Sequence, residues 1–83
     1  DSEIPSWMNE AVSKLPLSGR ERGIVVELLK GKTRSEIGST LFISPETVKW
    51  HTRRVYRKLR VSTKIELVQR VLAETTVQLE NRS

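Results

Sequence analysis

Four helix starts can be identified from the capping residues of this sequence. Ser18, Thr33 and Thr63 each stand three residues before a glutamate. This is the spacing of a capping box, in which the hydroxyl and the carboxylate each accept a backbone N–H. A fourth start is Ser44 followed by Pro45, because the first N–H of a helix has no partner and proline lacks it at no cost. The predicted helices cover residues of about 19–30, 34–41, 45–59 and 64–74.

Apolar residues recur at helical spacing inside each of these segments. The stripes are Ile24, Val25, Leu28 and Leu29; Ile37 and Leu41; Val48, Val55 and Leu59; and Leu67, Val68, Val71 and Leu72. Gly31 follows the first stripe and is expected to end its helix in the left-handed conformation. No segment alternates like a strand between hairpin turns. The sequence therefore predicts an all-α fold, and 83 residues suffice for one domain.

The segment before Ser18 has a weaker pattern. Its apolar residues lie at roughly helical spacing between Pro5 and Pro16, and they are Ile4, Trp7, Met8, Val12 and Leu15. Residues 1–16 are thus expected to be a short amphipathic helix or the end of an interdomain linker. Residues 17–74 form the helical domain, and residues 75–83 are a C-terminal extension with few apolar side chains. A chain that begins with Asp1 is also expected to be a piece of a longer protein.

The positive charge of the chain is concentrated on the third predicted helix. Between Pro45 and Arg60 there are six basic residues and one acid, whereas the remaining nine basic and nine acidic residues cancel. A cationic helix on an otherwise neutral domain is typical of a protein that binds phosphates. The absence of cysteine excludes disulfides and Cys-containing zinc sites, and it is consistent with a cytoplasmic location.

Only Phe42, Ile43 and Ser44 separate the second and third predicted helices. A short helix, a turn of three or four residues and a longer helix make a helix-turn-helix arrangement. In this geometry the second helix can enter the major groove of DNA while the first lies across the backbone.

Several sequence blocks carry a family resemblance. They are Leu17-Ser18-x-Arg20-Glu21, Gly31-x-Thr33-x-x-Glu36-Ile37, Leu41-x-Ile43-Ser44 and Thr47-Val48-Lys49-x-His51-x-x-x-Val55-Tyr56-x-Lys58-Leu59. From about Leu17 to Leu72 the chain resembles the LuxR-type helix-turn-helix domain, the output domain of many bacterial transcription factors, including NarL/FixJ-class response regulators. The resemblance implies a four-helix DNA-binding domain that follows a receiver or sensor domain and forms dimers on pseudo-palindromic sites. The full-length protein could then be membrane-anchored.

The resemblance also implies which residues read DNA bases. These are Lys49, Trp50 and Arg53. Arginine can donate to both acceptors of guanine, and tryptophan can contact the methyl group of thymine.

Other polar side chains are expected to contact phosphates and so to fix the register of the domain on DNA. Arg54, Arg57 and Lys58 are better placed for phosphates than for bases. Ser44 and Thr47 lie at a helix start, where exposed N–H groups bind anions. A second phosphate could lie at Thr33 and Arg34, at the start of the preceding helix.

Pairing of two copies is expected through the last helix. Besides its inward-facing residues, this helix carries Ile65 and Leu72, which one small core does not need. The alternative is that both residues pack on Trp7, Met8 or the first helix.

No feature predicts catalysis, a cofactor or a metal. His51, the only histidine, lies on the apolar side of its helix and is expected to be a hydrogen-bonded core residue. Gly31-Lys32-Thr33 imitates the end of a phosphate-binding loop, but Val26 stands where that motif needs glycine.

Four positions depart from the family pattern. Gly23 and Gly38 lie inside helices, where glycine costs up to about 1 kcal/mol relative to alanine. Glu27 replaces a common apolar residue, and Arg60 replaces a small turn residue.

Two other function classes fit parts of the pattern. One is a promoter-reading module of the sigma-factor type, which would act through RNA polymerase. The other is a basic helix that lies on a membrane surface. The membrane alternative fits poorly, because the core needs the apolar side of the basic helix.

Overall fold

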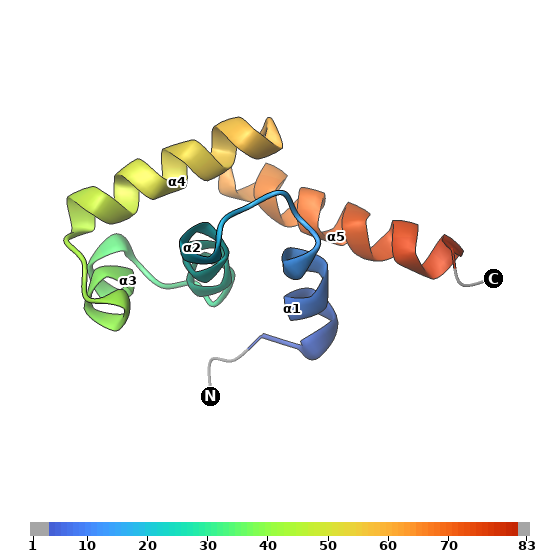
Figure 1. Cartoon of the computed structure of the whole chain (residues 1–83), viewed down its shortest axis with the longest axis horizontal. Coiled ribbons are helices and arrows are strands. Elements are labelled where there is room, and N and C mark those ends of the chain that lie inside the picture. Colours follow the sequence, from blue (N-terminus) through green and yellow to red (C-terminus); the bar gives the residue numbers. More distant parts are fainter. Residues whose placement is uncertain (1–3, 82–83) are drawn as a thin grey trace.

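The chain folds into five helices, as a computed structural model shows for the backbone of residues 4–81 and the side chains of residues 4–75 (Figure 1). The helices are α1 (Ser6–Ser13), α2 (Gly19–Leu29), α3 (Arg34–Leu41), α4 (Pro45–Leu59) and α5 (Lys64–Asn81). No strand occurs in residues 4–81. The all-α prediction is confirmed, and the four predicted helices begin where their caps indicated.

Two helices begin with complete capping boxes. The Ser18 hydroxyl accepts the N–H of Glu21 at 3.2 Å, and the Glu21 carboxylate accepts the N–H of Ser18 at 2.9 Å. Thr33 and Glu36 repeat this arrangement at the start of α3, with distances of 3.2 and 2.8 Å. At the start of α4 the Ser44 hydroxyl accepts the N–H of Thr47 at 3.1 Å. These side chains satisfy N–H groups that have no partner within the helix.

The start of α5 differs in one detail from its prediction. Thr63 Oγ1 accepts the N–H of Glu66 at 3.1 Å, but the Glu66 carboxylate accepts the N–H of Ser62, one residue earlier than in a capping box. The helix also runs to Asn81, well into the predicted extension 75–83. Predictions on residues 1–3 and 82–83 lie outside the described residues.

The N-terminal segment supplies the short additional helix allowed for in the predicted fold. Pro5 precedes α1, and Ala11, Val12 and Leu15 are buried. In Figure 1 α1 lies beside α2 and below the first part of α5, and it packs against both. The segment thus belongs to the core of the domain.

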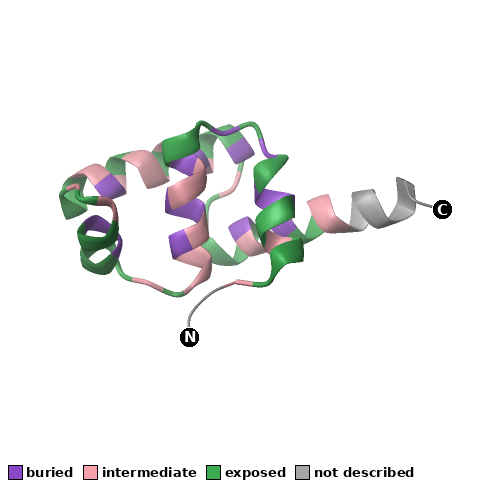
Figure 2. Cartoon of the chain, turned by 60° about the horizontal axis from the view of Figure 1, so that its bottom comes forward, coloured by how far each residue is buried: buried purple, intermediate pink, exposed green. Residues whose placement is uncertain are grey.

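Figure 2 shows the buried residues in purple on the helices. The apolar ones form a core of two parts, and α2 contributes to both. The larger part joins α1, α2, α4 and α5, and it contains Ala11, Val12, Leu15, Leu17, Val25, Val55, Leu59, Leu67 and Val71. The smaller part consists of Ile24, Ile37 and Val48, one residue each from α2, α3 and α4. Consequently α3 is fixed to the domain by a small apolar contact and by its close approach to α4.

That close approach depends on Gly38. A Cβ atom at this position would lie 2.5 Å from the carbonyl oxygen of Ile43. The N–H of Ile43 in turn donates to the carbonyl oxygen of Gly38 at 3.0 Å. The turn between α3 and α4 thus occupies the space of a side chain, which the departure from the family pattern at Gly38 did not reveal.

Within residues 4–81, three residues that follow helices adopt the left-handed conformation. Gly31 does so with φ of 85°, as predicted, whereas Phe42 (φ 60°) and Arg60 (φ 58°) adopt it despite their side chains. Among residues 4–81, none of the helices is both long and apolar enough to cross a membrane.

Candidate nucleic-acid interface

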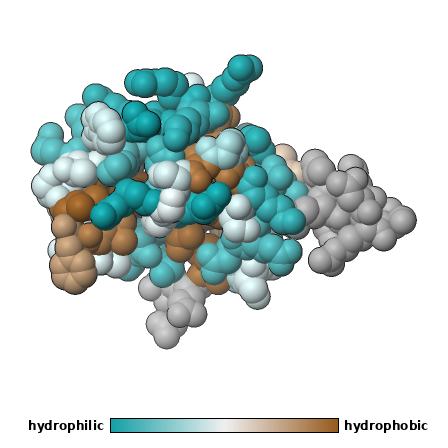
Figure 3. All heavy atoms as spheres, viewed as in Figure 1, coloured by the Kyte–Doolittle hydropathy of each residue, from teal (hydrophilic) through white to brown (hydrophobic). Residues whose placement is uncertain are grey.

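The long helix α4 has one buried side and one exposed, cationic side. Val48, Val55 and Leu59 are buried, in agreement with the predicted stripe. The exposed side carries Glu46, Trp50, Arg53, Arg57 and Lys58, and the exposed Arg60 follows the helix as its C-cap. Figure 3 shows hydrophilic atoms along the upper edge of the molecule, where α4 lies in Figure 1. This exposed side of α4, from Ser44 to Arg60, is called the basic surface below.

The three predicted base-reading residues lie toward the N-terminal end of this surface. Arg53 is exposed, Trp50 keeps 56% of its accessible surface, and Lys49 is half-buried. All three lie within the N-terminal three turns of α4, the part of a recognition helix that contacts base edges in helix-turn-helix proteins.

The predicted phosphate ligands at the start of α4 lie together. Ser44 Oγ is 2.9 Å from Thr47 Oγ1, and both hydroxyls stand at the helix terminus that carries the positive partial charge. Thr33 and Arg34 are exposed at the corresponding end of α3. Each pair combines side-chain polar atoms with the N–H groups of a helix start, which is a favourable arrangement for an anion.

Two further predicted phosphate ligands are held in ion pairs with a buried carboxylate. Lys58 Nζ lies 2.8 Å from Glu21 Oε1, and Arg54 Nε lies 3.5 Å from Glu21 Oε2. Only 3% of the Glu21 side chain is exposed. The hydrogen bond from Lys58, together with that from the N–H of Ser18, lowers the pKa of Glu21 to about 2 against the opposing effect of burial.

Sequence reasoning missed this cluster of Glu21, Arg54 and Lys58. Residues 33 and 37 positions apart in the chain form its contacts, so no local spacing reveals them. The one sequence feature that pointed to this cluster is the presence of both Glu21 and Lys58 in the family blocks. The cluster joins the start of α2 to the second half of α4, and it leaves one net positive charge among its three members.

The guanidinium of Arg54 also lies over the indole ring of Trp50, with Cζ 4.8 Å from the ring centroid. The imidazole of His51 meets the same indole at 5.0 Å between centroids and an interplanar angle of 75°. His51 is half-buried, and its buried Nδ1 has no hydrogen-bond partner within the part of the chain that the structure describes. The prediction of a hydrogen-bonded core histidine is therefore wrong at this atom. The ring packs against Trp50 instead.

A second buried carboxylate explains one departure from the family pattern. Glu27 is paired with Lys32 at 2.8 Å and with Lys30 at 3.3 Å. These partners, chiefly Lys32, lower the pKa of Glu27 despite its burial. The two lysines follow Glu27 at the end of α2, so the ion pairs compensate for the lack of an apolar side chain.

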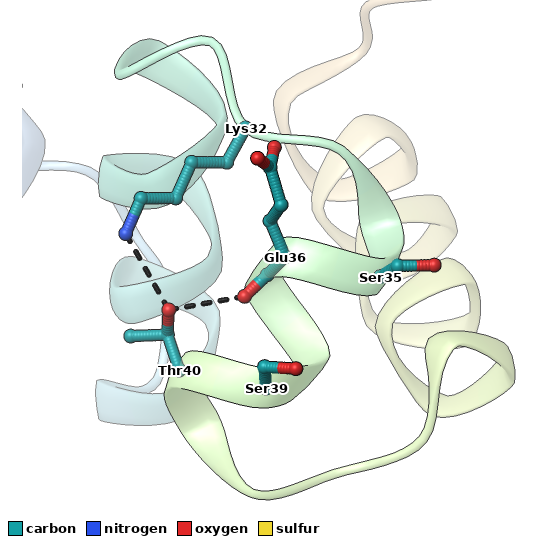
Figure 4. A pocket seen from close by; sticks show the side chains of 5 residues that line it. All are labelled: Lys32, Ser35, Glu36, Ser39 and Thr40. Carbon is teal, nitrogen blue, oxygen red and sulfur yellow. Dashed lines mark hydrogen bonds between the residues drawn. The ribbon is translucent and has the colours of Figure 1, made fainter.

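A shallow polar pocket lies beside this ion-pair cluster (Figure 4). It is lined by Lys32, Ser35, Glu36, Ser39 and Thr40. Lys32 Nζ donates to Thr40 Oγ1 at 3.4 Å, and that hydroxyl donates to the Glu36 carbonyl at 3.0 Å. These groups thus satisfy one another within the pocket. The described residues contain no group of three or more histidine, aspartate or glutamate side chains that could hold a metal ion.

The two residues predicted to mediate pairing are on the outer side of α5. Ile65 keeps 71% of its accessible surface and Leu72 keeps 43%, whereas Leu67 and Val71 are buried. Residues seven apart lie on the same face of a helix. Because 71% of the Ile65 surface is exposed, this side chain packs little against α1 or α2.

Comparisons with known proteins agree with this architecture. The family model described as "Bacterial regulatory proteins, luxR family" matches residues 15–71. The chain is 41% identical over 49 residues to a nitrate/nitrite response regulator protein homolog of Haemophilus influenzae, covering 59% of the chain and 24% of that protein. It is 39% identical over 56 residues to the transcriptional regulatory protein UhpA of Escherichia coli, covering 68% and 29%.

A third relative is the transcriptional activator protein SolR of Ralstonia solanacearum, 38% identical over 70 residues that cover 84% of the chain and 29% of that protein. The chain thus spans 24% to 29% of the length of these relatives. No solved structure matches the chain significantly. With five helices, a helix-turn-helix at α3 and α4, and a family match over most of its length, the chain belongs to the luxR family of bacterial regulatory proteins.

Proposed function

We propose that this chain is the sequence-specific DNA-binding output domain of a bacterial transcription regulator, and that α4 lies in the major groove. The observation that carries the proposal is the basic surface: α4 buries its apolar side and exposes arginines and lysines on the other. Membership of the luxR family and the names of the relatives support it. They favour this function over a sigma-factor type of module, and the buried stripe of α4 argues against a membrane-surface helix.

In this proposal Lys49, Trp50 and Arg53 contact base edges. Bidentate contacts from an arginine contribute about 1–3 kcal/mol of discrimination per base pair. The phosphate contacts come from Thr33, Arg34, Ser44, Thr47, Arg54, Arg57 and Lys58. Because Glu21 already holds Arg54 and Lys58, these two would contribute less charge to a phosphate than Arg57 does.

The wider setting of the domain is also part of the proposal. We expect a receiver or sensor domain upstream in the full-length protein, action in the cytoplasm, and pairing of two copies through Ile65 and Leu72. RNA polymerase is a candidate partner of the assembled regulator. The name of the Haemophilus relative, a response regulator protein homolog, supports the receiver.

The test begins with selection of preferred duplexes from a random DNA library. Arg53→Ala should then weaken binding to the selected duplex by about 1–3 kcal/mol and bring it closer to binding of a random duplex. Arg57→Ala should weaken both duplexes alike. Lys14→Ala, which removes an exposed charge at the end of α1, should leave both affinities nearly unchanged. Equal losses for Arg53→Ala and Arg57→Ala on both duplexes would overturn the division between base and phosphate contacts.

A further inference from the structure

We infer that Trp50 reads the 5-methyl group of a pyrimidine in the major groove and that Arg54 and Glu21 are positioning residues for its indole ring. This inference rests on the proposed function, and it names a base class and a mechanism for that site. It starts from three linked contacts: Glu21 with Arg54, Arg54 with Trp50, and Trp50 with His51.

The indole of Trp50 is exposed and nevertheless held. It retains 56% of its accessible surface, although Arg54 lies over its ring at 4.8 Å and His51 meets it edge-to-face at 5.0 Å. Residues four apart on a helix are neighbours, so Trp50 and Arg54 can make this contact without distorting α4. A cation over an aromatic face is attracted by the ring quadrupole. The contact therefore favours one orientation of a large side chain on the basic surface.

The guanidinium of Arg54 is oriented in turn by Glu21. Its Nε faces Glu21 Oε2 at 3.5 Å, while Oε1 of the same carboxylate accepts from Lys58 at 2.8 Å and from the N–H of Ser18 at 2.9 Å. Glu21 is buried and tied to the start of α2, so it is a fixed point of the domain. The core thus fixes Glu21, Glu21 orients the guanidinium of Arg54, and Arg54 orients the indole of Trp50.

The exposed part of the indole suits an apolar group on a base edge. Among the groups that bases present in the major groove, the methyl at C5 of thymine is the apolar one, and the others are hydrogen-bond donors and acceptors. 5-Methylcytosine carries the same methyl at the same position. An indole has one N–H donor and no acceptor, whereas its ring can cover a methyl group closely. Lys49 and Arg53, on either side in sequence, can serve the neighbouring acceptors.

Positioning matters because an unrestrained tryptophan would lose rotamer freedom when it binds. A side chain already held in its bound orientation avoids most of that loss. Removing Arg54 should therefore weaken the methyl contact even though Arg54 does not touch the methyl.

The first experiment uses the unbound protein. Trp7→Phe leaves Trp50 as the only tryptophan, since the chain has two. In this background Arg54→Gln should increase the amplitude of fast indole motion in time-resolved fluorescence anisotropy and raise quenching by acrylamide. Glu21→Gln should give a smaller increase, and Arg57→Gln none. Circular dichroism confirms that each variant is folded. Unchanged motion in a folded Arg54→Gln protein would overturn the positioning role.

The second experiment measures base reading on a selected duplex. Replacing thymines one at a time with uracil removes single methyl groups, and one position should weaken binding about three- to fivefold, as expected for one buried methyl. Trp50→Ala should abolish this penalty, Arg54→Gln should reduce it, and Arg57→Gln should keep it while lowering overall affinity. Cytosine at that position should bind better when it carries the 5-methyl group.

The outcomes separate the inference from the proposed function. An equal uracil penalty in the wild-type and Trp50→Ala proteins means that another residue reads the methyl, although the domain still binds DNA. Binding of no duplex at all would overturn both the proposed function and the base reading. The anisotropy experiment uses no DNA, so it tests the positioning role of Arg54 and Glu21 independently of DNA binding.

Discussion

Lys58 Nζ lies 2.8 Å from the Oε1 of Glu21, a carboxylate with only 3% of its side chain exposed. The contact joins the last turn of α4 to the first turn of α2. A buried carboxylate is costly unless it is paired and hydrogen-bonded, and Glu21 meets this need with Lys58, Arg54 and the N–H of Ser18. Loss of the carboxylate charge should therefore weaken the domain and its recognition helix together.

Glu21→Gln should lower the free energy of unfolding at neutral pH by on the order of 2–3 kcal/mol. The pKa of Glu21 is lowered from 4.5 to about 2 in the folded protein. A lowered carboxylate pKa gives stability that is present above the unfolded value, near 4.5, and is lost as the pH falls toward about 2. Urea titrations should thus show that the difference in free energy of unfolding between the wild-type and Glu21→Gln proteins decreases as the pH falls over this range.

The matched control for that measurement is Glu10→Gln, because Glu10 is exposed on α1. It should leave the free energy of unfolding nearly unchanged across the same pH range. Glu27 is present in all three proteins, so its own acid dependence cancels in the differences. If the wild-type and Glu21→Gln proteins differ by the same free energy of unfolding from neutral pH to about pH 2, the stabilisation does not come from the Glu21 charge.

Replacing two of the helical glycines with alanine should change the stability of the domain in opposite directions. A Cβ atom added at Gly23, in α2, would meet no neighbouring atom within 4 Å, so Gly23→Ala should stabilise the domain by up to about 1 kcal/mol. Gly38→Ala would bring a Cβ to 2.5 Å from the carbonyl oxygen of Ile43 and should destabilise it by about 1–3 kcal/mol. Thermal unfolding of both variants provides the measurement. Equal stabilisation by both would show that the turn between α3 and α4 yields easily.

The left-handed end of α3 leads to a third prediction. Phe42 has φ of 60° and keeps 92% of its accessible surface, so it contributes strain and almost no packing. Phe42→Asn should raise the free energy of unfolding by about 0.5–1 kcal/mol, because asparagine tolerates this conformation. Leu41→Asn, at a partly buried neighbour in a helical conformation, should instead destabilise the domain. A loss of stability in Phe42→Asn would mean that the aromatic ring has a packing role.

These cases show which features the sequence could predict. Helix starts follow from short-range chemistry, so Ser18, Thr33 and Ser44 sufficed to locate α2, α3 and α4. The buried and exposed sides of α4 follow from spacing alone. The pairing of Glu21 with Lys58 and the need for glycine at 38 depend on chain segments brought together by folding. The length of α5 was underestimated because its final turns carry few apolar residues.

The salt dependence of DNA binding provides a fourth prediction. If the basic surface neutralises about five phosphates, the logarithm of the binding constant should fall with the logarithm of salt concentration with a slope of about −4 to −5 per monomer. Arg57→Gln should make the slope less steep by about 0.9, whereas Trp50→Ala should leave it unchanged. Titrations of a duplex at several salt concentrations give these slopes. A slope near zero would remove the electrostatic basis of the proposed function.

Pairing through α5 leads to the last prediction. One recognition helix reads one half-site, and two-fold pairing would place two such helices about 34 Å apart in successive major grooves. Ile65, with 71% of its surface exposed, is the most exposed large apolar residue among those that the structure describes on α5. Sedimentation should therefore show two chains on a palindromic duplex and one chain on its half-site. Ile65→Glu should bind the palindrome more weakly and without cooperativity, whereas Ser6→Glu, which adds the same charge on α1, should behave like the wild-type protein. A strict one-to-one complex on both duplexes would exclude pairing through α5.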